Sequence, residues 1–278
     1  MPTALFISSH LDDVAFSCGG TLTRLVEDGW DAILCTVFTA SVVAPTGFAL
    51  ACQTDKGLAP DVDYLALRRE EDRRFAEIAG AADVIHLPHR EAPHRGYHSA
   101  PALFGGERPD DEVWREVAGD LRRLATALAP EVVFAPQGLG GHVDHLQTIR
   151  AVVAADLADR ARWYRDTPYA IRDPGACPSP LLPAALREYA VTLTEEVLAR
   201  KLDGCCAYTT QLGYQFGGPE RLRMALADFA RAEARRLGAA GRAEGLLSAR
   251  HRYPLRGMPI RYDDPIPPVA EEDWDASR

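Results

Sequence analysis

Two short stretches of the chain carry histidines and carboxylates at spacings that suit a metal ion. In the first, His10 and Asp13 are three residues apart in a tight turn, so an imidazole nitrogen and a carboxylate oxygen can reach one ion at about 2.0–2.2 Å. In the second, Gly-Gly-His-Val-Asp-His, His145 can supply a third ligand. A His, Asp, His set leaves room for water, which is typical of catalytic rather than structural zinc sites.

Three further polar residues in these stretches could move or hold protons. Asp12 adjoins a predicted ligand but faces differently, so it is a candidate general base for that water. His142 lies one helical turn before His145 and could stabilise an oxyanion or protonate a leaving amine. Asp144 would fix the orientation of a histidine and keep it charged. Either stretch alone is weak evidence, because histidines at helical spacing often only cap a helix; together they favour a metal site.

The apolar pattern predicts an α/β fold that brings the two stretches together. Predicted strands at 3–9, 31–39, 83–87 and 131–136 alternate with predicted helices at 18–29, 64–79, 111–129 and 145–158. This alternation predicts a Rossmann-like, doubly wound, mostly parallel sheet with helices on both faces. Ligands of such sheets bind beyond the carboxyl ends of the strands, and residues 10–13 and 138–145 follow two of those ends.

We expect a single domain over residues 1–278, with the motifs in a core of about 3–211 and a helical and irregular extension at 212–278. Helices are predicted at 194–208 and 219–237, and the end from Pro254 is predicted to be irregular. Residues 40–63 and 88–110 are rich in Gly, Pro and polar residues and too long for ordinary connections, which is typical of functional loops.

Composition restricts the class of partner. A net charge of −9 argues against a protein that neutralises phosphates on nucleic acid or on an anionic membrane. No apolar run reaches the roughly 18 residues that span a bilayer, and no basic region precedes the short apolar stretch near residue 1, so we expect a cytoplasmic protein. The six cysteines form no CxxC pair, which argues against a thiolate zinc site. A homo-oligomer is left open.

The two stretches resemble the signatures of the PIG-L or LmbE-like family of metal-dependent de-N-acetylases. SSHLDDVAFSCGG is similar to the P-H-x-D-D-E signature, with Ser9 and Val14 in place of proline and glutamate, and GGHVDH is similar to H-x-D-H. Arg68 and Glu71 in RREEDRRFAEIAGA resemble the R-x-x-E helix of the family. WYRDTPYA and KLDGCCAYTTQ extend the resemblance, which therefore covers about residues 4–211.

The resemblance implies a hydrolase, acting on a linear amide C–N bond, that removes an N-acetyl group from an amino sugar or its conjugate and releases acetate. By position it implies metal ligands at His10, Asp13 and His145, a general base at Asp12, an acid or oxyanion stabiliser at His142 and the partner of His142 at Asp144. The expected metal is zinc, with iron or another divalent ion left open, because His and Asp ligands accept several ions. The expected partner is a small-molecule amino-sugar conjugate.

Two residues outside the metal stretches are candidates for substrate binding. Glu91 stands where relatives commonly carry an aspartate in a loop that faces the substrate, so it could bond a sugar hydroxyl or simply be an exposed loop residue. Arg68 could organise the site through Glu71 or form a surface ion pair. Gly19 and Gly20 are expected to let the helix start pack close to the first strand, since the G-x-G-x-x-G pattern is absent.

Two other functions stay open at this point. A metal-dependent phosphoester hydrolase is disfavoured by the acidic charge and the lack of a basic cluster near the motifs. A noncatalytic sugar-binding relative is disfavoured by Asp12, because a binding protein has no use for a base beside the ligands. Four histidines at irregular spacing between residues 86 and 98 are expected to be solvated, or to make one substrate contact, rather than to bind a second metal.

Overall fold

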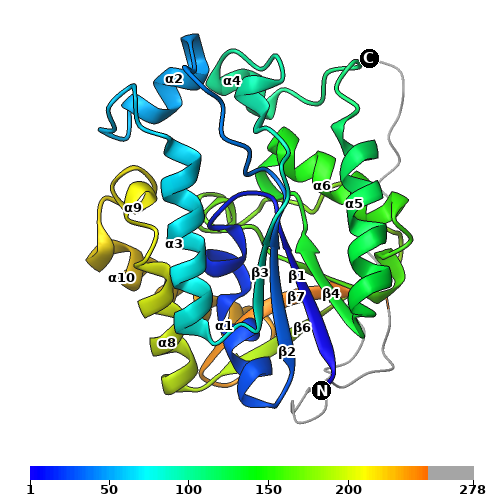
Figure 1. Cartoon of the computed structure of the whole chain (residues 1–278). Helices are drawn as coiled ribbons and strands as arrows, with labels where there is room; N and C mark the ends of the chain where they lie inside the picture. Colours follow the sequence, from blue (N-terminus) through cyan, green and yellow to red (C-terminus); the bar gives the residue numbers. More distant parts are fainter. Residues whose placement is uncertain (250–278) are drawn as a thin grey trace, which may run out of the picture.

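The computed structural model describes residues 1–249, which are built around one seven-stranded sheet (Figure 1). Its strands are β1 (Thr3–Ser8), β2 (Asp31–Thr36), β3 (Asp83–His86), β4 (Val132–Pro136), β5 (Ala161–Tyr164), β6 (Arg187–Leu193) and β7 (Arg242–Ser248). The strand order is β3-β2-β1-β4-β5-β7-β6. Strands β1 to β5 pair in parallel, whereas β7 is antiparallel to β5 and β6. The predicted α/β class with a mostly parallel sheet is confirmed.

Helices cover both faces of this sheet (Figure 1). One face packs against α1 (Asp13–Glu27), α3 (Tyr64–Ala79), α8 (Glu195–Cys205) and α10 (Pro219–Arg236), and the other packs against α5 (Val113–Leu128) and α6 (Val143–Ala154). In β1, Phe6 points into the first core and Ile7 into the second. Burial on both faces explains why this strand is a continuous apolar run rather than an alternating one.

Helix α1 begins at Asp13, five residues before the predicted start at residue 18, and it kinks at Cys18, where φ is −132°. The glycines after the kink do allow a close approach, but not to the first strand as predicted. A Cβ atom on Gly20 would lie 2.7 Å from the Leu193 side chain and 2.8 Å from the Glu244 carboxylate. Glu244 accepts the backbone N–H of Gly20 at 3.0 Å, so Gly20 packs against β6 and β7. A Cβ atom on Gly19 would instead contact Phe75 of α3 and Lys201 of α8, at 3.4 Å and 3.5 Å.

The predicted extension at 212–278 contains an internal strand of the sheet. Strand β7 lies between β5 and β6, and α9 (Thr209–Phe216) leads into α10, which packs against β7. The end from Pro254 that the sequence predicts to be irregular lies outside the described residues. Within residues 1–249, no helix combines the length and the apolar character needed to cross a membrane.

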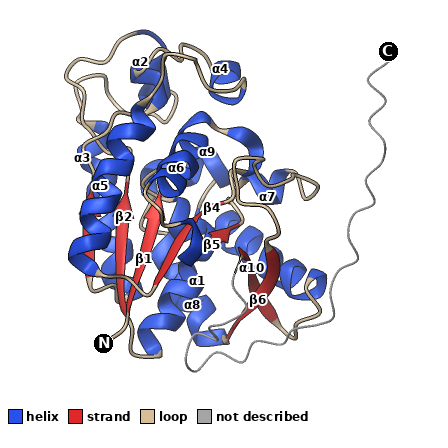
Figure 2. Cartoon of the chain, turned by 90° about the vertical axis from the view of Figure 1, so that its right-hand side faces the viewer, coloured by secondary structure: helices blue, strands red, loops and turns tan. Residues whose placement is uncertain are grey.

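The two long connections lie beyond the carboxyl ends of the strands. Residues 40–63 contain α2 (Gly47–Thr54), and residues 88–110 contain a short 3-10 turn at Ala92–His94 and α4 (Ala100–Phe104). Both views place α2 and α4 at the same end of the molecule, opposite the N-terminus (Figures 1 and 2). The remaining short helix, α7 (Tyr169–Arg172), follows β5. These segments therefore lie over the edge of the sheet where ligands of α/β proteins bind.

Candidate metal centre and catalytic cleft

The chain order reverses between β1 and β4, which are neighbours in the sheet, and this switch point holds the predicted metal ligands. Oδ2 of Asp13 lies 3.4 Å from Nδ1 of His10 and 3.3 Å from Nε2 of His145. Two donors that each lie about 2.0–2.2 Å from a tetrahedral ion are about 3.3–3.6 Å apart. Nε2 of His145 is buried and has no hydrogen-bond partner among the described residues. Both distances from Oδ2 of Asp13 therefore suit donors that share one zinc ion.

Each of the two histidines uses its other ring nitrogen to contact a carboxylate. Nε2 of His10 lies 2.9 Å from Oδ2 of Asp144, and Nδ1 of His145 lies 2.5 Å from Oδ1 of Asp166. Oδ2 of Asp166 accepts the backbone N–H of Leu139 at 3.0 Å, which fixes this carboxylate in turn. Carboxylates placed behind histidine ligands orient the rings and raise their affinity for metal. Sequence reasoning missed Asp166, which follows β5 at the same edge of the sheet.

The carboxylate of Asp144 does not contact His142, in contrast to the expectation from the sequence. Its carboxylate contacts His10, accepts the backbone N–H of Ala92 at 3.1 Å and forms an ion pair with Arg95 at 2.7 Å. Burial raises the pKa of Asp144, but the positive charge of Arg95 and the contact with His10 outweigh burial and hold this pKa well below its usual range. Arg95 is held in place by Asp111, whose carboxylate lies 3.0 Å away.

His142 faces the same centre but makes a different contact. Three histidines, His10, His142 and His145, each place one ring nitrogen within 4.8 Å of a ring nitrogen of the other two. Nδ1 of His142 accepts the backbone N–H of Asp144 at 3.2 Å, which caps the start of α6. Burial, followed by the charge of His10, lowers the pKa of His142 to about 3, so its ring is neutral. A neutral ring that accepts at Nδ1 carries its proton at Nε2, so Nε2 is available as a donor.

Asp12 lies beside the three donors, and burial and a neighbouring positive charge act on its pKa in opposite directions. Burial raises the pKa of Asp12 to about 7, although the guanidinium of Arg68, 3.2 Å from its Oδ2, acts in the opposite direction. A carboxylate with a pKa near neutrality suits a general base. Arg68 is buried and also donates to the backbone oxygen of Leu11 at 3.0 Å and to Glu91 at 2.9 Å. The structure therefore places Arg68 and Glu91 together, next to Asp12.

Glu71 is not the partner of Arg68 that the sequence suggested. Its carboxylate accepts the hydroxyls of Thr209 and Thr210 at 2.7 Å each, which ties α3 to the start of α9. Two of the loop histidines also differ from expectation. His86 and His89 are not solvated but lie 2.9 Å and 2.8 Å from the carboxylates of Asp72 and Asp120.

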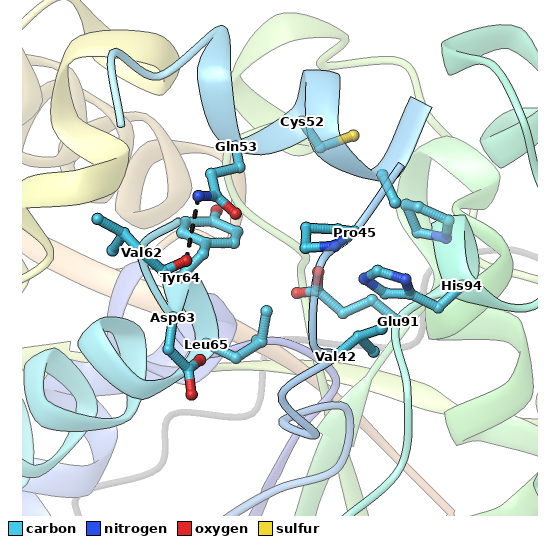
Figure 3. Close-up of a pocket in the computed structure, with 12 residues that line it drawn as sticks. Val42, Pro45, Cys52, Gln53, Val62, Asp63, Tyr64, Leu65, Glu91 and His94 are labelled. Carbon is cyan, nitrogen blue, oxygen red and sulfur yellow. Dashed lines mark hydrogen bonds between the residues drawn. The ribbon is translucent and has the colours of Figure 1, made fainter. Parts of the chain in front are cut away.

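A cleft of about 310 Å³ opens over these residues. Its inner wall consists of the strand-end residues His10, Asp12, Asp13, His142 and Asp144, together with Arg68 and Glu91. Its outer wall is built by α2, α4, α7 and α9 and by the residues around them, with the aromatic side chains Phe48, Tyr64, Phe104, Tyr169 and Tyr214. A smaller pocket of about 20 Å³ lies beneath α2 and shares Cys52, Tyr64, Glu91 and Pro93 with the cleft (Figure 3).

Comparison with known proteins finds related sequences. The model of the PIG-L family, described as GlcNAc-PI de-N-acetylase, matches residues 5–156, more than half of the chain. A 2'-N-acetylparomamine deacetylase from Streptomyces fradiae is 36% identical over 60% of this chain and 57% of its own length. A 1D-myo-inositol 2-acetamido-2-deoxy-alpha-D-glucopyranoside deacetylase from Mycobacterium sp. (strain KMS) is 30% identical over 59% of this chain and 52% of its own length. The chain thus spans about half the length of these relatives.

Solved structures are similar over a larger part of the chain. The zinc-inhibited form of a teicoplanin deacetylase has a TM-score of 0.75 at 26% identity and covers 88% of this chain and 97% of its own. A complex of a deacetylase with teicoplanin has a TM-score of 0.73 at 25% identity, and the match covers 88% of this chain and 97% of the deacetylase chain. The similarity therefore extends well beyond residues 5–156, the segment that the family model matches.

Proposed function

Because the chain belongs to the PIG-L family, we propose that it is a metal-dependent hydrolase that removes the acetyl group from the nitrogen of an amino sugar or amino-sugar conjugate. The convergence of His10, Asp13 and His145 on one point, with Asp12 beside them, carries this proposal. The named substrates of the two relatives support it, because both carry an acetamido group on a sugar ring. The teicoplanin deacetylases share the fold.

Zinc is the proposed metal, held by Nδ1 of His10, Oδ2 of Asp13 and Nε2 of His145, with iron as the alternative that the same ligands accept. A zinc ion in such a site lowers the pKa of a water molecule and polarises an amide carbonyl. Asp144 and Asp166 orient the two histidines by accepting their second ring protons.

The chain's own residues handle the protons. Asp12 takes a proton from the water that attacks the acetamide carbon, and its raised pKa lets it hold that proton near neutral pH. Nε2–H of His142 donates to the acetamide oxygen as negative charge develops there. The proton on Asp12 then passes to the sugar nitrogen as the C–N bond breaks, which gives acetate and a free amine. Arg68, which lies 3.2 Å from Oδ2 of Asp12, orients this carboxylate.

Release of acetate by zinc-loaded protein tests the proposal. The wild type is assayed with a panel of N-acetylglucosamine conjugates, beside Asp12→Asn and a control, Asp61→Asn, which changes an exposed carboxylate that does not line the cleft. We expect Asp12→Asn to lose roughly 10²–10⁴-fold in kcat at unchanged zinc content. Zinc-loaded wild type that frees no acetate from any conjugate contradicts the proposal, and phosphate release from a phosphoester panel would support the alternative hydrolase.

Four further expectations from the sequence stay predictions. These are a single domain over residues 1–278, a cytoplasmic location, the absence of nucleic-acid and membrane partners, and a possible homo-oligomer. The pairing of β7 with β5 and β6 supports the first, because it places residues 242–248 inside the same sheet as the motifs.

A further inference from the structure

The outer wall of the cleft exposes aromatic surface. Among the large apolar side chains that are exposed within residues 1–249, only Phe104 and Tyr214 are aromatic, at 46% and 62% exposure, and both line the cleft. The ring of Phe104 lies 5.3 Å from the ring of His142 and 5.9 Å from that of Tyr169, so this surface continues into the inner wall. Exposed aromatic surface next to a catalytic site is typical of ligand binding.

A lysine lies between two rings of the same wall. Nζ of Lys56 is 4.9 Å from the ring centre of Tyr214 and 5.3 Å from that of Tyr64, within the range of a cation–π interaction. It donates to the backbone oxygen of Cys52, which belongs to α2 above Tyr64 (Figure 3). Lys56 makes no ion pair within the described chain, so its remaining two donors and its charge are available to a ligand.

The charges of the two walls differ. On the inner wall, the positive charge of Arg68 is already paired with Asp12 and Glu91. On the outer wall, Arg172 donates to the side-chain oxygen of Gln215 at 2.6 Å and, like Lys56, forms no ion pair with any described residue. Asp55, which directly follows α2, contributes one negative charge to the outer wall. Two cations and one anion leave the outer wall with a positive charge.

We propose that the outer wall binds the group attached to the acetylated sugar, and that this group is an aromatic ring, preferably one that carries an anionic substituent. The proposal rests on the deacetylase function proposed above. Tyr214 and Phe104 offer faces and edges for a flat ring, and Lys56 and Arg172 attract a carboxylate on it. An aglycone that carries ammonium groups is disfavoured, because the two cations repel it.

Four β-glycosides of N-acetylglucosamine separate these effects. Their aglycones are methyl, phenyl, 4-carboxyphenyl and 4-(aminomethyl)phenyl, and acetate release gives kcat/KM for each with zinc-loaded enzyme. We expect the phenyl glycoside to exceed the methyl glycoside by about 2–10-fold, the usual range for an aromatic contact. We expect the carboxyphenyl glycoside to exceed the aminomethylphenyl glycoside by about 5–10-fold at low salt. Equal values for all four, or the highest value for the aminomethylphenyl glycoside, would overturn the proposal.

Variants assign these preferences to residues. Tyr214→Ala should bring the phenyl glycoside close to the methyl glycoside, and Lys56→Met should bring the carboxyphenyl and aminomethylphenyl glycosides together. Met224→Ala is the matched control, because Met224 is also exposed but does not line the cleft. If the preferences survive in both cleft variants, they do not come from this wall and the proposal is wrong.

A binding measurement decides the proposal without turnover, because the chain contains only two lysines, Lys56 and Lys201. Lys201 is buried and lies 2.6 Å from the Glu244 carboxylate, so reductive ¹³C-methylation should label Lys56 and the terminal amine of Met1. Methylation keeps the charge. In the Asp12→Asn background, where hydrolysis is expected to be roughly 10²–10⁴-fold slower, the Lys56 methyl resonance should shift on addition of the carboxyphenyl glycoside, whereas the Met1 resonance should not.

The outcomes separate this proposal from the deacetylase function. A shifted Lys56 resonance without acetate release from any of the four glycosides would support the aromatic subsite and contradict the deacetylase function. Acetate release at one rate from all four, with an unshifted Lys56 resonance, would support the deacetylase function and overturn the subsite. Lys56→Arg, which removes the labelled amine but keeps the charge, confirms the assignment of the resonance.

Discussion

The inner and outer walls of the cleft are built in different ways. Asp13 and Asp144 of the inner wall, and the neighbouring His145, are buried at the starts of the helices that follow β1 and β4, and their polar atoms contact residues from distant parts of the chain. The outer wall is carried by short helices with little burial: Gln53 is the only buried residue of α2, and α4 has none. Nε2 of Gln53 donates to the backbone oxygen of Val62 at 3.1 Å, within the same segment (Figure 3).

This difference agrees with the roles that we propose for the two walls. A metal site and a general base must keep their geometry within fractions of an ångström, which requires anchoring in the core. A surface that selects the substituent of a substrate can be carried by connections, which change in sequence without disturbing the core. Changes on the inner wall should therefore act on the chemical step and on metal affinity, whereas changes on the outer wall should act on choice of substrate.

After Asp12→Asn, the largest effect is expected from His142→Asn on the inner wall. The Oδ1 atom of asparagine takes the place of Nδ1 and can still accept the backbone N–H of Asp144, but asparagine has no donor in place of the imidazole Nε2–H, which the proposed mechanism directs to the acetamide oxygen. We expect kcat to fall by roughly 10²–10³-fold, as for the loss of one oxyanion donor. Zinc content should not change, as measured by metal analysis beside the control His98→Asn, which alters an exposed histidine. A parallel loss of zinc would mean that His142 is itself a ligand.

A smaller effect is expected from Asp166→Asn, which tests the support behind the metal site. The amide cannot stabilise the proton on Nδ1 of His145 as a carboxylate does. Nε2 of His145 therefore becomes a weaker ligand for zinc. Zinc affinity should fall about 10–100-fold, measured by competition with a chromophoric chelator. Asp61→Asn, at an exposed position, is the control. Unchanged zinc affinity would show that the carboxylate at 2.5 Å serves the fold alone.

The inner wall is also the part that the sequence predicts best. The runs that became β1 and β4 are apolar at residues 4–7 and 132–136 because these residues are buried on both faces of the sheet. The polar residues that follow them lie where parallel strands end. Asp166 was missed because β5, which precedes it, has no such run. This strand includes Arg162, which is buried and bonded to Ser248. A buried arginine in a sequence is easily mistaken for an exposed one.

The same reason explains why β7 could not be predicted. Its sequence, Arg-Ala-Glu-Gly-Leu-Leu-Ser, contains Glu244, whose charge is paired with Lys201 in the interior at 2.6 Å. The partner is 43 residues away, so no local pattern shows that this glutamate is buried. Outer-wall residues were missed for a different reason, because side chains on long connections follow no helical or strand periodicity.

The smallest effect, a change in the free energy of unfolding, is expected for a valine in the segment that carries part of the outer wall. A buried valine of β4 gives the matched comparison. Val43, between β2 and α2, is 94% exposed, whereas Val133 of β4 is fully buried at 0%. Val133→Ala should lower the free energy of unfolding by about 1.5–3 kcal/mol, because it removes two buried methyl-sized groups and leaves a cavity. Val43→Ala should change it by less than about 0.5 kcal/mol, as surface substitutions usually do. Urea unfolding of both variants measures the difference at unchanged m value. A cost for Val43→Ala as large as that for Val133→Ala would show that residues 40–63 are part of the folded core, and the contrast between the two walls would then be wrong.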